Sequence, residues 1–165
     1  MLKEIKKRSF EEVWNLAENN NFNQAVLIEV KTEIIPDEDQ WQLLDYLKTE
    51  YHYTYNNKLI IDYSMRYTQK DIEEEGEKKV LAWIKEDKKR LKEFENGKVW
   101  MNGIKAVAKI AIPSKMDKSY KTTIIKSPGL WGIESDSSKS YIEEVKQQEL
   151  KELENELKML NVLIK

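Results

Sequence analysis

The sequence contains no cysteine, one histidine, three prolines and five glycines among its 165 residues. The absence of cysteine excludes disulfides, thiolate metal sites and a cysteine nucleophile, and it agrees with a reducing compartment. Scarce glycine and proline, with 35% charged and 40% hydrophobic residues, are typical of an ordered, helix-rich protein. The length predicts a single domain over residues 1–165, with a core large enough to fold unaided.

Long apolar runs are also missing from the sequence. No hydrophobic stretch approaches the roughly 20 residues that span a bilayer. The basic start Met1–Arg8 resembles the beginning of a signal peptide, but Ser9-Phe10-Glu11-Glu12 follows where an apolar segment should stand. We therefore expect an intracellular, cytoplasmic protein without a membrane partner.

Charge is distributed unevenly along the chain, although the formal net charge is only −2. Residues 11–62 hold 11 acidic and 3 basic side chains, whereas residues 88–126 hold 11 basic and 3 acidic ones. Such segregation permits a dipolar surface that orients a charged partner, unless the two segments cancel one another in the fold.

Helical spacing of apolar residues predicts two long helices. One runs from Thr68 to Phe94 and is interrupted by Gly76. The other begins near Ser140 and carries a leucine seam over residues 150–164 at 3-4 spacing. This seam packs on the protein's own sheet or long helix, or else joins two copies, so a monomer and a homodimer both stay open.

Period-two patterns and turn residues predict the strands. Residues 25–35 form a half-buried strand, and residues 51–67 form a hairpin whose parity favours a three-residue loop at 56–58. Asn102-Gly103 is a strong hairpin signal and predicts a second hairpin, with a further strand over 120–126. The predicted fold class is α+β: an antiparallel sheet built from two hairpins, packed against a long central helix and a C-terminal helix.

The second predicted hairpin carries the first candidate binding surface. Its register places Trp100 directly across from Lys105, with Lys109 and the next strand's Lys121 on the same face. Lysines attract phosphates, and an exposed indole stacks on a base for about 1–3 kcal/mol. The same face could receive an acidic protein surface, or it is a solvated face with Trp100 in a cation–π contact to Lys105.

The acidic segment suggests a second candidate surface. Asp37, Glu38 and Asp39, followed by Asp45 and Glu50, could imitate an array of phosphates and occupy the basic groove of a nuclease. The first three are also favourable residues for the N-terminus of a helix.

Motifs for catalysis are sparse. His52 is the sole histidine, and no Walker loop, G-x-G-x-x-G or H-E-x-x-H sequence is present. The tripeptide Glu29-Val30-Lys31 matches the acid-x-Lys pattern of some nucleases, but no aspartate precedes residue 37. We therefore expect no catalytic residue and no cofactor.

The stretch SPGLWGIESDSSKSY, residues 127–141, is either a joint or a site. As a joint, it would plug the end of the core with Trp131 and its apolar neighbours, and its serines would cap the helix that follows. As a site, Glu134 and Asp136 would offer oxygen ligands to magnesium or calcium.

The block GLWGIESDS at 129–137, the following YIEEV and the upstream NGIKAVAKI resemble a pattern in small, uncharacterised proteins of bacteriophages and other mobile elements. The resemblance covers residues 100–160 at most. It implies a bacterial or phage cytoplasm and an accessory role, such as blocking a host defence, and it supplies no catalytic residues.

The expected function is that of a non-enzymatic macromolecule-binding accessory protein of a phage or mobile element, acting on a host protein complex such as a defence nuclease. The first alternative is a small nucleic-acid-binding protein that uses the Trp100, Lys105 and Lys109 face. The second alternative is a Mg²⁺-dependent enzyme.

Overall fold

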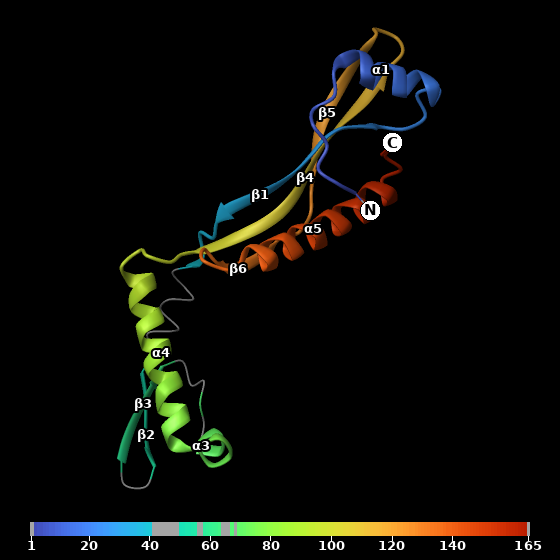
Figure 1. The fold of residues 1–165 in the computed structure, drawn as a ribbon. Coiled ribbons are helices and arrows are strands. Elements are labelled where there is room, and N and C mark those ends of the chain that lie inside the picture. The colour runs from blue at the N-terminus through green and yellow to red at the C-terminus, as the bar shows by residue number, and fades with distance from the viewer. Residues whose placement is uncertain (1, 41–49, 56–57, 64–66, 68, 165) are drawn as a thin grey trace. The chain divides into compact units, whose positions relative to one another are not determined.

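The computed structural model describes residues 2–40, 50–55, 58–63, 67 and 69–164, with the backbone alone for 50–55, 58–63 and 69. The chain divides into two compact units. The first unit combines Met1–Pro36 with Asn102–Lys165, and the second comprises Asp37–Met101. Helices and antiparallel strands occur together, which confirms the predicted α+β class (Figure 1). The prediction of a single domain over residues 1–165 stays a prediction.

A four-stranded sheet forms the centre of the first unit. The central strand is β4 (Met101–Ser114), which is antiparallel to both β1 (Val26–Pro36) and β5 (Ser119–Lys126). A short strand, β6 (Leu130–Glu134), also pairs with β4. No helix among the described residues is long and apolar enough to cross a bilayer.

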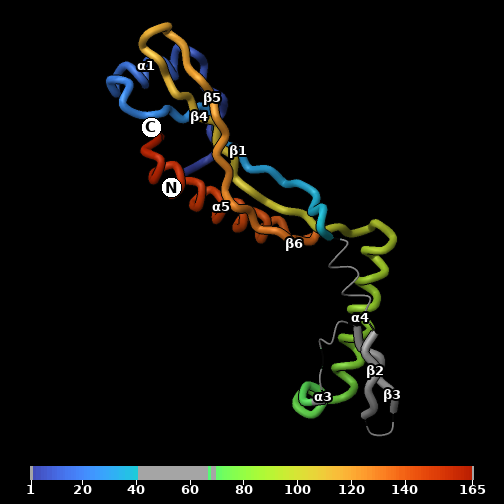
Figure 2. Tube along the Cα trace, turned by 180° about the vertical axis from the view of Figure 1, so that it is seen from behind, coloured from blue at the N-terminus to red at the C-terminus, as the bar shows by residue number. Residues whose placement is uncertain are grey.

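Helices cover both faces of this sheet, but to different extents. Helix α5 (Lys139–Met159) runs along one face, as Figure 2 shows, and buries Leu150, Leu153 and Leu157 against Ala106 and Ala108 of β4. The predicted leucine seam is therefore used within the chain, although Leu160 at its end is exposed.

Helix α1 (Phe10–Asn19) covers one end of the opposite face. It begins with a capping box, in which Ser9 and Glu12 each accept from the other's backbone N–H. Its buried residues Val13 and Ala17 pack on Ala111 of β4. Ala111 follows Ile110 of the α5-facing cluster, so the two helices lie on opposite faces of the strand.

The predicted hairpin at Asn102-Gly103 is wrong. Strand β4 runs straight through both residues, which pair with Pro36 and Ile35 of β1. The φ of Gly103 lies outside the left-handed region, so this glycine makes no turn. A Cβ atom built on it would lie 2.4 Å from the ring of Trp131. Glycine is required here because an indole ring approaches the backbone, not because the chain reverses.

The strand predicted over residues 25–35 forms as β1, but its side chains do not keep one parity. A β-bulge between Leu27 and Glu29 shifts the register with β4. Ile28 consequently packs with the α1 cluster, whereas Val30 packs with the α5 cluster. Ile34, further along the same strand, is 48% exposed.

The first hairpin of the prediction forms in the second unit, with a different register. Strand β2 (Glu50–Tyr55) is antiparallel to β3 (Lys58–Tyr63), and Tyr55 pairs with Lys58. This pairing leaves two residues between the strands, so the predicted three-residue loop is wrong. The structure describes only the backbone of this hairpin, so the side chains of its tyrosines and of His52 lie outside the description.

The predicted central helix forms as two helices, α3 (Gln69–Glu75) and α4 (Glu77–Glu95). Gly76 between them has a φ of 90°, which a residue with a side chain rarely adopts. The helix was predicted to bury a stripe of apolar residues, and five of its six members are buried: Ile72, Val80, Ile84, Leu91 and Phe94. The sixth, Trp83, is only partly buried. Helix α4 packs against β3.

Candidate binding surface

The sheet of the first unit has a charged face on the side away from α5. Successive residues of a strand point to opposite faces, so Lys105, Val107, Lys109 and their partners in the neighbouring strands share the face opposite to Ala106 and Ala108. We call it the open sheet face. It consists of Glu29, Lys31, Glu33, Lys105, Val107, Lys109, Ile124, Lys126 and Trp131.

Trp131 occupies one end of the open sheet face. Its ring lies over Gly103, and its Nε1–H donates to the carbonyl oxygen of Pro128 at 3.4 Å. A Cβ atom built on Gly129 would lie 3.3 Å both from Trp131 Nε1 and from Cβ of Lys105, which places the indole beside this lysine. The side chain is 46% exposed, although the sequence predicted that it would plug the core. Leu130 and Ile133 do pack in the core, as expected.

Charges of opposite sign alternate across the open sheet face. Lys105 lies across from Glu33, and Lys109 lies across from Glu29. The Lys31 ammonium lies 2.8 Å from Glu33 and donates to it. This hydrogen bond, together with the charges of Lys31 and Lys105, holds the pKa of Glu33 below its ordinary value, against a smaller effect of desolvation. The acidic and basic segments of the sequence thus meet in adjoining strands and compensate one another.

Apolar side chains interrupt these charges. Ile124 lies across from Lys109 and is 57% exposed. Val107 lies between Lys31 and Lys126 and is buried, as expected where long lysine stems lie over an apolar side chain. The face therefore combines an exposed indole, an exposed isoleucine and paired charges.

The structure brings together only part of the predicted lysine and tryptophan surface. Lys105 and Lys109 share the open sheet face, but Lys121 pairs with Ile112 and points to the opposite side of the sheet. Trp100 belongs to the second unit, and the hairpin that would set it across from Lys105 does not form. Trp131 is the tryptophan that the structure places beside Lys105.

The predicted acidic surface begins with a tight turn in the second unit. The backbone N–H of Asp39 donates to the Asp37 carboxylate at 3.0 Å, and Asp37 N–H donates to the carbonyl of Met101 at 3.0 Å. Glu38 and Asp39 are exposed. The continuation of the predicted acidic segment lies at residues 41–49, outside the described residues.

A buried carboxylate that the sequence did not single out makes the stretch 127–141 a joint. Glu149 of α5 is 2% exposed, and its Oε2 accepts from Ser127 Oγ at 2.6 Å and from Gly129 N–H at 3.0 Å. Ser127 Oγ in turn accepts from Ala106 N–H at 2.8 Å. These bonds hold the segment that leads to Trp131 against α5 and β4. Its signal in the sequence was one glutamate at a position of α5 that faces the sheet.

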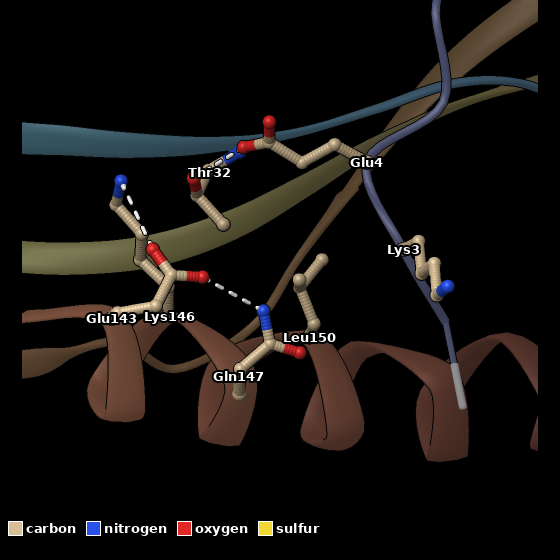
Figure 3. Close-up of a pocket in the computed structure, with 7 residues that line it drawn as sticks. All are labelled: Lys3, Glu4, Thr32, Glu143, Lys146, Gln147 and Leu150. Atoms are coloured by element: carbon tan, nitrogen blue, oxygen red, sulfur yellow. Dashed lines mark hydrogen bonds and ion pairs between the residues drawn. The ribbon is translucent and has the colours of Figure 1, made fainter. Parts of the chain in front are cut away.

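A polar pocket lies where the N-terminal segment passes β1 and α5 (Figure 3). Its volume is about 340 Å³. Glu4 accepts from the hydroxyl of Thr32 and, at 2.8 Å, from Thr32 N–H, while Lys146 lies 3.9 Å from Glu143. The hydrogen bonds from Thr32 lower the pKa of Glu4, assisted by the charge of Lys146 and opposed by desolvation. Among the described residues, no group of three or more histidines and acids is arranged to hold a metal ion.

No protein-family model, no curated protein and no solved structure matches the chain. The resemblance of residues 100–160 to proteins of phages and mobile elements stays a prediction.

Proposed function

We propose that this chain is a non-enzymatic binding protein that recognises a protein partner through the open sheet face. The observation that carries the proposal is the exposed ring of Trp131, which lies against the backbone at Gly103. A large aromatic side chain that is already ordered loses little conformational entropy on binding, and tryptophan is enriched among the residues that dominate interface energies.

The paired charges favour a protein partner over nucleic acid for this face. Nucleic-acid affinity depends on cations that neutralise phosphates. Glu29 and Glu33 lie across from two of the lysines and would repel a polyanion. Alternating charges around apolar side chains instead suit a protein surface, where complementary charges set the orientation of docking.

The biological setting is part of the same proposal. The chain acts in a bacterial or phage-infected cytoplasm as an accessory protein of a phage or mobile element, and its partner is a host complex such as a defence nuclease. The resemblance of the blocks at 102–110 and 129–145 supports this setting.

Differential capture from a lysate of bacterial host cells, treated with nuclease to remove nucleic acid, tests the proposal. The wild-type chain is compared with Trp131→Ala/Ile124→Ser, which removes both exposed apolar anchors. The matched control is Met116→Ser in the β4–β5 turn, where the side chain is 99% exposed. We expect mass spectrometry to identify a protein that the wild type and the control retain and that the double variant loses.

Titration of each chain with the purified partner then gives the change in binding affinity. Truncation of a tryptophan that dominates an interface costs at least about 2 kcal/mol, so Kd should rise on the order of 30-fold or more for the double variant. Equal affinity of the partner for all three chains would refute the proposed surface.

A further inference from the structure

A second charged surface lies on α4 of the second unit. Lys85, Lys88, Lys89 and Lys92 follow one another at i, i+3, i+4 and i+7, so they share one side of the helix. We call these four residues the lysine ridge. All four are exposed, and with Ala82 and Glu86 they line a hollow of about 600 Å³.

Other cations of the same region are already engaged by the chain. Lys79 is paired with Glu75 and lies 5.1 Å above the ring of Trp83. Arg90 is paired with Glu93 at 3.0 Å and lies over Phe94. Neighbouring acids and aromatic rings therefore compensate these charges.

The lysine ridge differs from these paired cations. Within the described part of the chain, Lys85, Lys89 and Lys92 make no ion pair or hydrogen bond, and Glu86 is the one acid that lines the hollow. Among the described residues, three of the four lysines of the ridge are consequently positive charges that no ion pair compensates.

The spacing of the ridge suits a nucleic-acid backbone. From Lys85 to Lys92 the helix rises about 10 Å, at ~1.5 Å per residue. A duplex carries one phosphate charge per ~1.7 Å of its axis, hence about six over the same distance. Lysine attracts phosphates as a point charge and needs no fixed geometry.

The same residues argue against base recognition and against an acidic protein as the occupant. No aromatic side chain is found among the described residues that line the hollow, so bases have no ring on which to stack. Protein interfaces are depleted in lysine, whereas contacts to phosphates are made largely by lysine and arginine.

We propose that the lysine ridge binds the phosphate backbone of nucleic acid without reading its sequence. This inference concerns a surface other than the open sheet face and is independent of the function proposed above. It adds a sequence-independent nucleic-acid contact in the second unit to a protein contact in the first.

Fluorescence anisotropy with a labelled duplex of about 15 base pairs tests the inference. If four lysines each neutralise one phosphate, log K should fall against log salt with a slope of about −3.6, so affinity should drop on the order of 100-fold between about 50 and 200 mM salt. The triple variant Lys85→Gln/Lys89→Gln/Lys92→Gln should make that slope shallower by about 3, since each lost phosphate contact removes roughly 1.

Two controls test whether duplex affinity depends on the lysine ridge itself, and not on the net charge of the chain or on the open sheet face. Lys7→Gln/Lys139→Gln/Lys151→Gln removes the same charge from exposed sites of the first unit and should leave duplex affinity within about two-fold of the wild type. Trp131→Ala should bind the duplex like the wild type. Far-UV circular dichroism should show unchanged helix content, because lysine and glutamine have similar helix propensities.

Three results would overturn the inference. The first is no binding of duplex at the lowest salt, and the second is an equal loss of affinity in both triple variants. The third is competition by poly-glutamate as strong as that by unlabelled duplex at equal charge, which would assign the ridge to acidic proteins. A single-stranded oligonucleotide that shows the same loss in the ridge variant supports the inference, since it shares the phosphate backbone.

Discussion

At the residue scale, the position of the Trp131 indole depends on the absence of a side chain at Gly103. The ring atoms Cε3, Cζ3 and Cδ2 of Trp131 all lie within 2.8 Å of the place where a Cβ of residue 103 would stand. Real Cβ contacts are not so short, so any larger residue at position 103 forces the ring to move. Glycine in the middle of a strand ordinarily costs about 0.5–1 kcal/mol relative to alanine, and here it leaves room for the indole.

The substitution Gly103→Ala should therefore lower the free energy of unfolding by about 1–3 kcal/mol, the usual cost of overpacking. In a Trp131→Ala background the same change should instead be neutral or stabilising by about 0.5–1 kcal/mol, since the obstacle is gone. Urea denaturation of the four chains gives the coupling between the two sites. Additive effects would mean that the ring does not lie over residue 103.

Glu4 makes stability depend on pH. Hydrogen bonds from Thr32 lower its pKa in the folded chain from the ordinary value of 4.5. A carboxyl group with a lowered folded-state pKa contributes stability that is present above its unfolded-state pKa and is lost as the pH falls through the folded-state pKa. The contribution is small, since the side chain is exposed.

Glu4→Gln should accordingly flatten the loss of stability below about pH 4.5, with Thr32→Val acting in the same direction. The measurement is the urea midpoint at a series of pH values from about 7 to 3. Glu38→Gln, an exposed carboxylate in the other unit, serves as the control. If the Glu4 and Glu38 variants lose stability identically at acidic pH, Glu4 does not make the pH-dependent contribution described above.

At the scale of elements, one hydrogen-bonded group joins α5, β4 and the segment before β6. The hydrogen bonds link the Glu149 carboxylate to the Ser127 hydroxyl and to the N–H of Gly129, and the Ser127 hydroxyl to the N–H of Ala106. Ser127 and Glu149 are buried, so water has little access to these groups. Removal of one partner leaves buried polar groups unpaired, and this is costlier than the loss of the bond itself.

Ser127→Ala should lower the free energy of unfolding by about 1–3 kcal/mol. The substitution removes the hydrogen-bond acceptor of the Ala106 N–H and one of the donors to the Glu149 carboxylate, and both groups are buried. Gln148→Ala on the exposed side of α5 removes a surface hydrogen bond to Glu152 and should cost less than about 0.5 kcal/mol. Thermal or urea unfolding compares the two. A Ser127 variant as stable as the Gln148 variant would argue against the buried joint.

Local patterns predicted the elements better than their pairing. The strand over 120–126 and the leucines of α5 depend on neighbours in the sequence, and both were found from local patterns. The role of Gly103 depends on an indole 28 positions later, and no local pattern records such an approach. Asn102-Gly103 therefore indicated a turn that the fold does not use.

In the candidate binding surface, too, local features were predicted better than the pairing of strands. Lys105 and Lys109 were assigned correctly to one face because strand parity is local. Their aromatic neighbour and their acidic partners were missed, because both come from strands whose register is set by tertiary packing and by the bulge at Leu27. The face was predicted as basic, and it is a face of paired charges.

At the scale of the whole molecule, the second unit is inserted between two paired strands of the first. Pro36 and Asn102, which flank Asp37–Met101 in the sequence, are directly opposite one another in the β1–β4 ladder. The sheet therefore needs only a short connection between these strands, and closing a shorter loop costs less conformational entropy.

Replacing Asp37–Met101 with a short glycine-containing turn should leave the first unit folded. We expect the shortened chain to retain its far-UV circular dichroism and to unfold in one cooperative transition. The full chain, followed by circular dichroism and by hydrogen exchange, should lose protection in both units together if residues 1–165 form the single domain that the sequence predicts. A shortened chain without a cooperative transition would show that the first unit depends on the second.

The meeting of Pro36 and Asn102 also bears on how such a gene can change. A coding segment whose two ends meet on neighbouring strands can be gained, lost or exchanged by recombination without altering the ladder around it. Selection could then change what the second unit recognises while the sequence of the first unit stays the same.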